Sequence, residues 1–145
     1  MEIQRIDTFS GHKAPIYSLE EGREPHFIYS AGSDGWVVEW NLQKPDVGKV
    51  LAHIEGSVYC LKLDRSSDIF WVGQNFEGIH GVQISDQNRV FSIAMPKKAI
   101  FDICFWDNQV WVAHDHGLIS VVDKESLQII KHIKSGDKSA RKFCL

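Results

Sequence analysis

One stretch of this sequence recurs twice further along the chain, and this repetition constrains the fold more than any other feature. The stretch at 28–41 is rich in β-branched and aromatic residues around a Ser-Asp-Gly turn. The stretch at 110–123 fits it residue for residue, and the stretch at 69–82 fits it with one residue inserted before the acid. The glycines that anchor the copies, Gly35, Gly78 and Gly117, are 43 and 39 residues apart. A period near 40 indicates one supersecondary unit repeated, in which each unit buries its apolar face against its neighbours.

Nearly every segment is predicted to be a short strand, because β-branched and aromatic residues alternate with turn residues. Segments 27–31 and 36–40 form a predicted hairpin around the Asp34-Gly35 turn. The cycle of strands restarts at intervals of 42 residues, with inner strands expected at 16–19, 58–61 and 100–103. Four short strands per repeat at this period are typical of a β-propeller blade rather than of a sandwich.

The two ends of the chain are predicted to be parts of further blades. Residues 3–9 resemble the outer strand of a blade, and residues 140–145 resemble the inner strand of another. The expected repeats are approximately 1–43, 44–86 and 87–125, followed by the start of a fourth at 126–145. The fold class is therefore all-β, with three full four-stranded repeats and partial blades at both ends. Closed propellers typically have 4–8 blades, so we expect an incomplete ring, continued in a longer chain or shared between chains.

The first repeat resembles the WD-repeat β-propeller family. It has Gly11-His12 before the first inner strand, Ser30 in the next strand, Asp34 before the turn glycine, and Trp40-Asn41 in place of the Trp-Asp dipeptide. In that family the equivalent His, Ser, Asp and Trp side chains form a hydrogen-bonded network within the blade. The resemblance therefore implies a structural network of His12, Ser30, Asp34 and Trp40.

The later repeats depart from the family pattern. In the second repeat Glu77 replaces the turn Asp and Gln83 stands where the Trp is expected. In the third repeat His116 replaces the acid and Val122 replaces the Trp. We therefore expect these two blades to be held by packing alone, and only one complete network.

Composition excludes several classes of function. A net charge of −3 over 145 residues provides no electrostatic footprint for nucleic acid or an anionic membrane. No apolar run approaches a membrane span, and the charged, strand-like start is unlike a secretory signal. Three widely spaced cysteines without a CxxC motif favour buried free thiols and a cytoplasmic protein.

The sequence contains no convincing catalytic or metal site, and no cofactor is expected. His12, Ser30 and Asp34 resemble a nucleophilic triad in composition, but each has a structural role in the implied network. His114 and His116 flank Asp115 on one turn, where a solvated turn is favoured over a zinc site because no third or fourth ligand is nearby in sequence. The segments expected to line the channel provide only Asp102 as a charged group.

The remaining candidates are residues that would bind a partner. Loops at one end of a propeller usually contact partners in this family, and aromatic or cationic side chains there are plausible anchors. The candidate residues are Lys13, Trp36, Phe76, Lys97, Lys98, His114 and His116. The alternative is that Trp36 and Phe76 only fill gaps between blades. The predicted function is a non-enzymatic scaffold that binds proteins or peptides, with two alternatives: a structural segment of a larger or oligomeric propeller, and an enzyme with a site in the channel.

Overall fold

The computed structural model describes residues 4–45 and 47–144, which form three four-stranded antiparallel sheets. The first sheet contains β1 (Ile16–Glu21), β2 (Phe27–Gly32), β3 (Trp36–Asn41) and β4 (Gly48–His53). The second contains β5 (Val58–Asp64), β6 (Ile69–Gln74), β7 (Gly78–Gln83) and β8 (Arg89–Ala94). The third contains β9 (Ile100–Trp106), β10 (Gln109–His114), β11 (Leu118–Asp123) and β12 (Ile129–Lys134), with one 3-10 turn, η1 (Asp115–Gly117). Within the described residues, no helix is long and apolar enough to cross a membrane.

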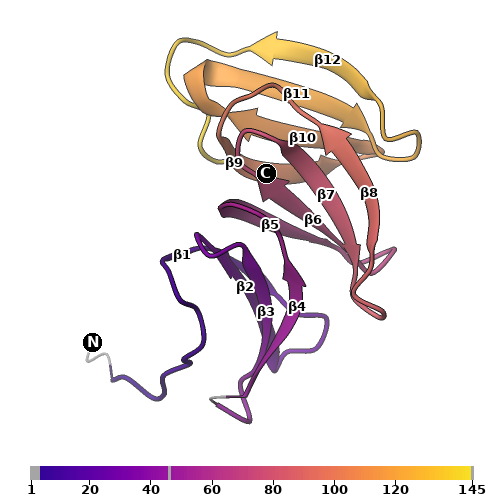
Figure 1. Ribbon diagram of the computed structural model, residues 1–145. Coiled ribbons are helices and arrows are strands. Elements are labelled where there is room, and N and C mark those ends of the chain that lie inside the picture. Colours follow the sequence, from indigo (N-terminus) through magenta and orange to yellow (C-terminus); the bar gives the residue numbers. More distant parts are fainter. Residues whose placement is uncertain (1–3, 46, 145) are drawn as a thin grey trace.

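The sheets lie one after another along an open arc, as Figure 1 shows. In each sheet the strands follow chain order from the inner to the outer edge. The inner strand β5 lies between β1 and β9, so the second sheet lies between the first and the third. The predicted fold class, propeller blades in an incomplete ring, is confirmed.

Apolar side chains hold adjacent sheets together because strand residues alternate between the two faces. Tyr29 and Val37 of the first sheet pack in one cluster with Leu61, Phe70 and Val82 of the second. A second cluster joins the second and third sheets, with Trp71, Ile79, Ile103, Val110 and Val122 among its buried members. The second sheet is thus covered on both faces.

The strand expected at 3–9 is absent from the described residues of that segment, 4–9. Phe9 instead packs edge-on against Trp40, with ring centroids 5.7 Å apart. Gly11 lies directly on the same indole, since an added Cβ would come within 2.9 Å of the ring. The N-terminal segment therefore covers part of the free face of the first sheet, and Ile3 lies outside the described residues.

The inner strand expected at 140–145 is not formed within residues 140–144, which have no assigned strand, and Leu145 lies outside the described residues. The segment nevertheless runs beside β9. The Phe143 N–H donates to the Asp102 carboxylate of β9 at 2.8 Å, as the Leu61 N–H of β5 donates to Ser18 Oγ of β1 at 3.1 Å. A strand needs a neighbour in a hydrogen-bonded ladder, and no described residue provides one for this segment.

The strand register corrects the expected insertion in the second repeat. Gly73 pairs with Ile79 in the second sheet just as Ala31 pairs with Val37 in the first, so the two hairpin loops have equal length. Gly78 is consequently the first residue of β7 rather than the equivalent of the turn glycine Gly35.

The same register reassigns two positions of the second repeat. Phe76, rather than Glu77, occupies the place of Asp34, and Val82, rather than Gln83, occupies the place of Trp40. The sequence alignment was wrong because it matched glycines, whereas the pairing is fixed by which side chains face the core.

Candidate functional site

Loops from all three sheets gather at one end of the arc, called here the Phe76 end. Backbone hydrogen bonds join them, for example from Ser33 N to Pro15 O at 2.9 Å and from Ile54 N to Gly35 O at 2.8 Å. The Phe76 end consists of residues 11–15, 33–35, 54–57, 75–77, 95–99, 115–117 and 135–139, with the first residues of the strands that follow. Six of the seven candidate binding residues lie here: Lys13, Trp36, Phe76, Lys97, Lys98 and His116.

Lys13 and Trp36 form one aromatic–cation pair at this end. The Lys13 ammonium lies 4.8 Å from the Trp36 ring centroid. Asp34 holds both residues, because its carboxylate accepts from Lys13 N at 2.8 Å and from Trp36 N at 3.2 Å. The half-buried Trp36 indole is therefore held in one position, with the Lys13 ammonium against its ring.

Phe76 is the most exposed aromatic residue at this end, with 55% of its surface accessible, and so does not fill a gap between sheets. Its backbone is left-handed, with φ of 66°, a conformation that is unusual for a bulky residue. Its N–H donates to Lys98 O at 3.1 Å, and the neighbouring Asn75 N–H donates to Ser57 O at 3.2 Å. Loops from two sheet connections thus hold the residue in an outward position.

The other cationic residues at this end differ in ion pairing and in solvent exposure. Lys98 forms an ion pair with Asp115 at 3.5 Å, and His116 is largely exposed beside the same carboxylate at 3.8 Å. Lys97 is exposed on the loop before β9. Together these residues surround the third hairpin.

His114, the seventh candidate, cannot contact a partner because it is fully buried. Its Nε2 lies 2.9 Å from Ser120 Oγ, while its Nδ1 has no hydrogen-bond partner among the described residues. Burial, reinforced by the charge of His132, lowers the pKa of His114 to about 4. Because the His114 side chain faces the sheet interior, only Asp115 and His116 of the expected solvated turn are accessible to solvent. The described residues contain no cluster suited to a metal ion.

In the first sheet, His12, Ser30, Asp34 and Trp40 form a continuous chain of hydrogen bonds. His12 Nδ1 lies 3.0 Å from the Asp34 carboxylate and its Nε2 lies 2.7 Å from Ser30 Oγ. Ser30 Oγ accepts from the Trp40 indole N–H at 2.7 Å. Burial opposes ionisation of Asp34, but hydrogen bonds from Lys13 N, His12 and Trp36 N outweigh it and lower its pKa.

This geometry leaves Ser30 without a catalytic environment. The hydroxyl is buried and has the indole N–H on one side and the imidazole on the other. A nucleophilic serine needs an open face toward substrate and an oxyanion hole. The arrangement can position side chains within the blade, but it cannot present a nucleophile.

The second and third sheets also contain polar networks, so the expectation that packing alone holds them is wrong. His80 Nδ1 lies 2.8 Å from Ser92 Oγ, and its Nε2 lies 2.5 Å from Gln74 Oε1. In the third sheet Ser120 Oγ lies 2.9 Å from His114 Nε2 and 3.0 Å from His132 Nδ1. Both networks occupy the same three positions, at the end of the second strand and on the paired third and fourth strands.

A sequence signal for these networks exists but is weak. Gln74, His80 and Ser92 have the same spacing as His114, Ser120 and His132, namely 6 and then 12 residues. The first sheet has Gly32, Val38 and Val50 at those positions and uses the other network instead. The signal is hard to see because His and Ser exchange places between the two sheets.

The inner strands carry more charge than their first four residues indicated. β1 and β5 extend far enough to pair Glu20 with Lys62 at 3.2 Å, and Asp102 pairs with Lys142 at 3.1 Å. One residue from each inner segment contributes to a row along the same edge: Tyr17, Tyr59, Phe101 and Arg141. The ring centroids of Tyr17 and Tyr59 are 4.4 Å apart and those of Tyr59 and Phe101 are 6.0 Å apart. The Arg141 guanidinium lies 4.7 Å from the Phe101 ring centroid. Glu20 and Asp102 are each paired with a lysine, so neither is a free acid on the inner strands.

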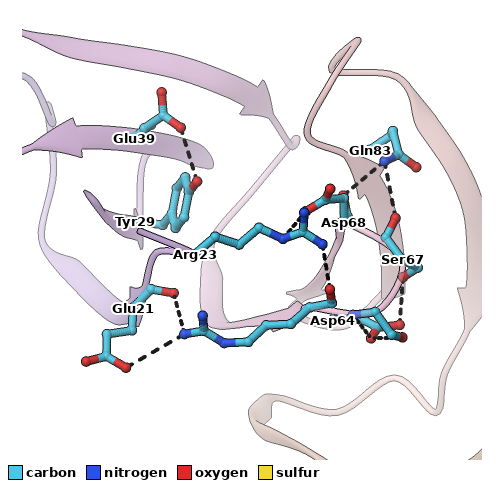
Figure 2. A network of polar contacts seen from close by, with 10 residues as sticks. Glu21, Arg23, Tyr29, Glu39, Asp64, Ser67, Asp68 and Gln83 are labelled. Carbon is cyan, nitrogen blue, oxygen red and sulfur yellow. Dashed lines mark hydrogen bonds and ion pairs between the residues drawn. The ribbon is translucent and has the colours of Figure 1, made fainter. Parts of the chain in front are cut away.

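The opposite end of the arc, called here the Arg23 end, is closed by charged contacts between sheets. Arg23 of the first sheet forms an ion pair with Asp68 of the second at 2.6 Å, and Figure 2 shows the two side chains meeting. Arg65 pairs with Glu21 in the opposite direction. Asp64 also accepts from Lys124 of the third sheet at 2.8 Å. Burial opposes ionisation of Asp64, but bonds from Lys124, Ser67 and Ser66 lower its pKa to about 2. Acids at this end therefore serve the contacts between sheets.

The two flanks of the arc expose apolar side chains. Leu19 of β1 is 67% exposed, although Leu61 and Ile103, at equivalent positions of the next two inner strands, are buried. The third sheet has a cavity of about 420 Å³ on its free face, lined by Cys104, Trp106, Trp111 and Phe143.

The three cysteines are free thiols in different environments. Cys60 is buried, Cys104 is partly exposed and Cys144 is exposed, so the expectation of three buried thiols is correct only for Cys60. Burial raises the pKa of the Cys60 thiol well above its ordinary range.

Comparison with solved structures identifies the class of fold. The chain superposes on the WD40 β-propeller domain of Doa1 with a TM-score of 0.77 and 16% identity, covering 90% of this chain and 44% of that one. It matches the β-propeller domain of Myceliophteria thermophila Cps50 (Swd1) with a TM-score of 0.74 and 19% identity, covering 94% and 47%. It also matches the computationally designed Ika4 protein with a TM-score of 0.76 and 19% identity, covering 99% and 88%.

These likenesses show the fold: the chain has the blade architecture of WD40 β-propellers, as the resemblance of its first repeat implied. It spans less than half the length of the two natural propeller domains. No protein-family model matches the sequence, and a search of curated proteins finds no match.

Proposed function

We propose that this chain is a non-enzymatic protein-binding module that contacts partner proteins through its Phe76 end. The observation that carries the proposal is the outward, rigidly held Phe76, flanked by loops that present further candidate residues. Exposed aromatic residues that are fixed before binding lose little conformational entropy in a complex, which makes them effective anchors. Rigid strands with loops at one end suit recognition rather than catalysis.

A capture experiment tests this proposal. The tagged chain is compared with Trp36→Ala and Phe76→Ala variants for recovery of the same identified partner, at matched protein concentration. Leu42→Ala serves as the control, because Leu42 is an exposed apolar residue at the Arg23 end. We expect the two Phe76-end variants to lose the partner and the control to retain it. Equal recovery by all variants would contradict the proposal.

The flanks favour a second candidate function, that of an assembly segment whose ends are covered by further blades. Leu19 occupies a position that is buried at both internal interfaces, and the free cavity beside Trp111 lies where the next sheet would pack. Exposed apolar patches of this kind mark contacts with another protein surface. Other blades, in the same or another chain, would supply the missing surface.

Sedimentation velocity separates this candidate from a purely recognition module. We expect the 145-residue chain at micromolar concentration to sediment as dimers or larger species, and Leu19→Glu to shift it toward the 16.5 kDa monomer. A well-behaved monomer of the unaltered chain would count against the assembly function and would leave partner binding at the Phe76 end unaffected.

A further inference from the structure

A groove of about 800 Å³ runs beside Phe76 and reaches from the loop end onto the outer strands of the second sheet. The 54–57 loop and the hairpin at 75–77 line it at the loop end, and residues of β6, β7 and β8 line the rest. Its lining includes Glu55, Gln74, Phe76, Glu77, His80 and Arg89. The groove is therefore formed by residues of the second sheet and by the loop that precedes it.

Phe76 is an unusual residue for its place in the hairpin. The equivalent residues are Asp34 in the first sheet, which binds His12, and His116 in the third. His116 is also left-handed, with φ of 51°, but a glycine follows it, whereas Glu77 follows Phe76. Because its ring is more exposed than buried, packing does not account for this arrangement. Strained, exposed residues of this kind are found at functional sites.

Hydrogen bonds hold the lining of the groove in place. Ser92 contacts Nδ1 of His80, whose Nε2 donates to the Gln74 side-chain oxygen. The Gln74 amide in turn donates to the Glu55 carbonyl, which ties the hairpin to the preceding loop. Burial, together with the nearby charge of Arg89, lowers the pKa of His80. A neutral imidazole can make both hydrogen bonds, one at each ring nitrogen. The groove is consequently formed before any partner arrives.

Two acidic residues line the groove beside Phe76 without an ion-pair partner among the described residues. Glu55 and Glu77 are exposed and form no ion pair with any described residue, whereas Glu20, Asp64 and Asp68 elsewhere are all paired. Arg89 and Ala94 are the two ends of β8, roughly 17 Å apart along the strand. Ala94 pairs with Gly78, close to Phe76, so Arg89 lies at the end of the strand away from Phe76. The Phe76 side of the groove therefore combines an aromatic face with two free carboxylates.

We propose that this groove binds an extended segment of a partner protein that places a lysine or arginine over Phe76, between Glu55 and Glu77. An aromatic ring attracts a cation through its face, and carboxylates pair with the same ammonium or guanidinium group. The inference rests on the proposed function and specifies the chemistry of the partner.

The test uses a phage-displayed library of random nine-residue peptides, selected on the immobilised chain with Phe76→Ala as the counter-selection. We expect the selected peptides to share one lysine or arginine. Combining Glu55→Lys with Glu77→Lys should weaken the binding of these peptides by roughly tenfold or more, since two exposed ion pairs are lost and two like-charge contacts of similar size replace them. A fresh selection on that double variant should yield aspartate or glutamate at the same position.

The matched control combines Glu24→Lys and Glu125→Lys, which makes the same charge change at exposed positions of the Arg23 end. It should bind the selected peptides as the unaltered chain does. Peptides without a shared basic residue, an equal loss in the control, or no enrichment at all would each overturn the inference. Failure of this kind would be distinguishable from failure of the proposed function, because partner capture that depends on Trp36 would persist.

Discussion

His80 of β7 faces Ser92 of β8 at 2.8 Å, and the third sheet repeats this pair with the two residue types exchanged, Ser120 facing His132. Each sheet thus has one polar network, either across its inner loop or across its outer strands. Buried polar groups are usually hydrogen-bonded, and these networks satisfy His80, Ser120 and one nitrogen of His114.

The network of the first sheet predicts non-additive mutational effects. Trp40→Phe removes the donor to Ser30 Oγ and His12→Ala removes the imidazole, and each should lower the free energy of unfolding by about 1–3 kcal/mol. Because both act on one hydroxyl, the double variant should lose less than the sum. Urea denaturation of the four proteins checks this. Val122→Ala is the control, since it belongs to the third sheet and should add independently to His12→Ala. Strict additivity of the first pair would mean that no shared network exists.

The buried His114 predicts a loss of stability in mild acid. Its pKa is about 4 in the folded chain against an ordinary value of 6.5, so the unfolded chain binds the extra proton between these values. The free energy of unfolding should therefore fall as pH drops from 6.5 to 4, by up to about 3 kcal/mol from this group, whose own contribution changes little below pH 4. Denaturation at pH 7, 5.5 and 4 measures the slope.

His114→Gln is the matched variant, because Gln74 occupies the same position in the second sheet. It should flatten most of this pH dependence while retaining a side chain that can bond Ser120. An unchanged slope in the variant would show that His114 is not the titrating group.

Ser30 is expected to resist covalent labelling by organophosphonate probes in the folded chain. Its hydroxyl is buried between His12 and Trp40, so a probe cannot approach it. Mass spectrometry of the treated protein measures the labelled fraction. Stoichiometric modification of Ser30 would establish a nucleophilic role.

Replacement of Phe76 separates backbone strain from side-chain packing. Phe76→Gly should be more stable than Phe76→Ala by about 1 kcal/mol, because glycine adopts the left-handed conformation without a Cβ clash. Thermal unfolding of both variants gives the comparison. If the alanine variant were the more stable one, φ at this position would not be positive in solution.

Much of the fold was predictable because the strands have a two-residue period and the hairpins carry turn signals. The Asp34-Gly35 turn and the inner strand starts at Ile16, Val58 and Ile100 lie where the repeat places them. The structure of the two terminal segments was not predictable. A strand needs a paired neighbour, and the segments at 4–9 and 140–144 have none among the described residues.

The candidate site was only partly predictable. Loop positions follow from strand order, so Trp36, Phe76 and the lysines could be assigned to one end. The burial of His114 could not be predicted, because it depends on which face of the sheet the side chain of the last residue of β10 points to. The register near Phe76 was also hidden, since glycine matching obscured the equal hairpin lengths.

The central claim, that partners bind at the Phe76 end, is tested most directly by hydrogen exchange of the chain alone and in complex with a captured partner. We expect new protection on binding in residues 33–36, 54–57, 75–77 and 95–99, with no change at 65–68 and 84–88 of the Arg23 end. Protection confined to β1 and β10 on the open flanks, or to the Arg23 end, would contradict the account.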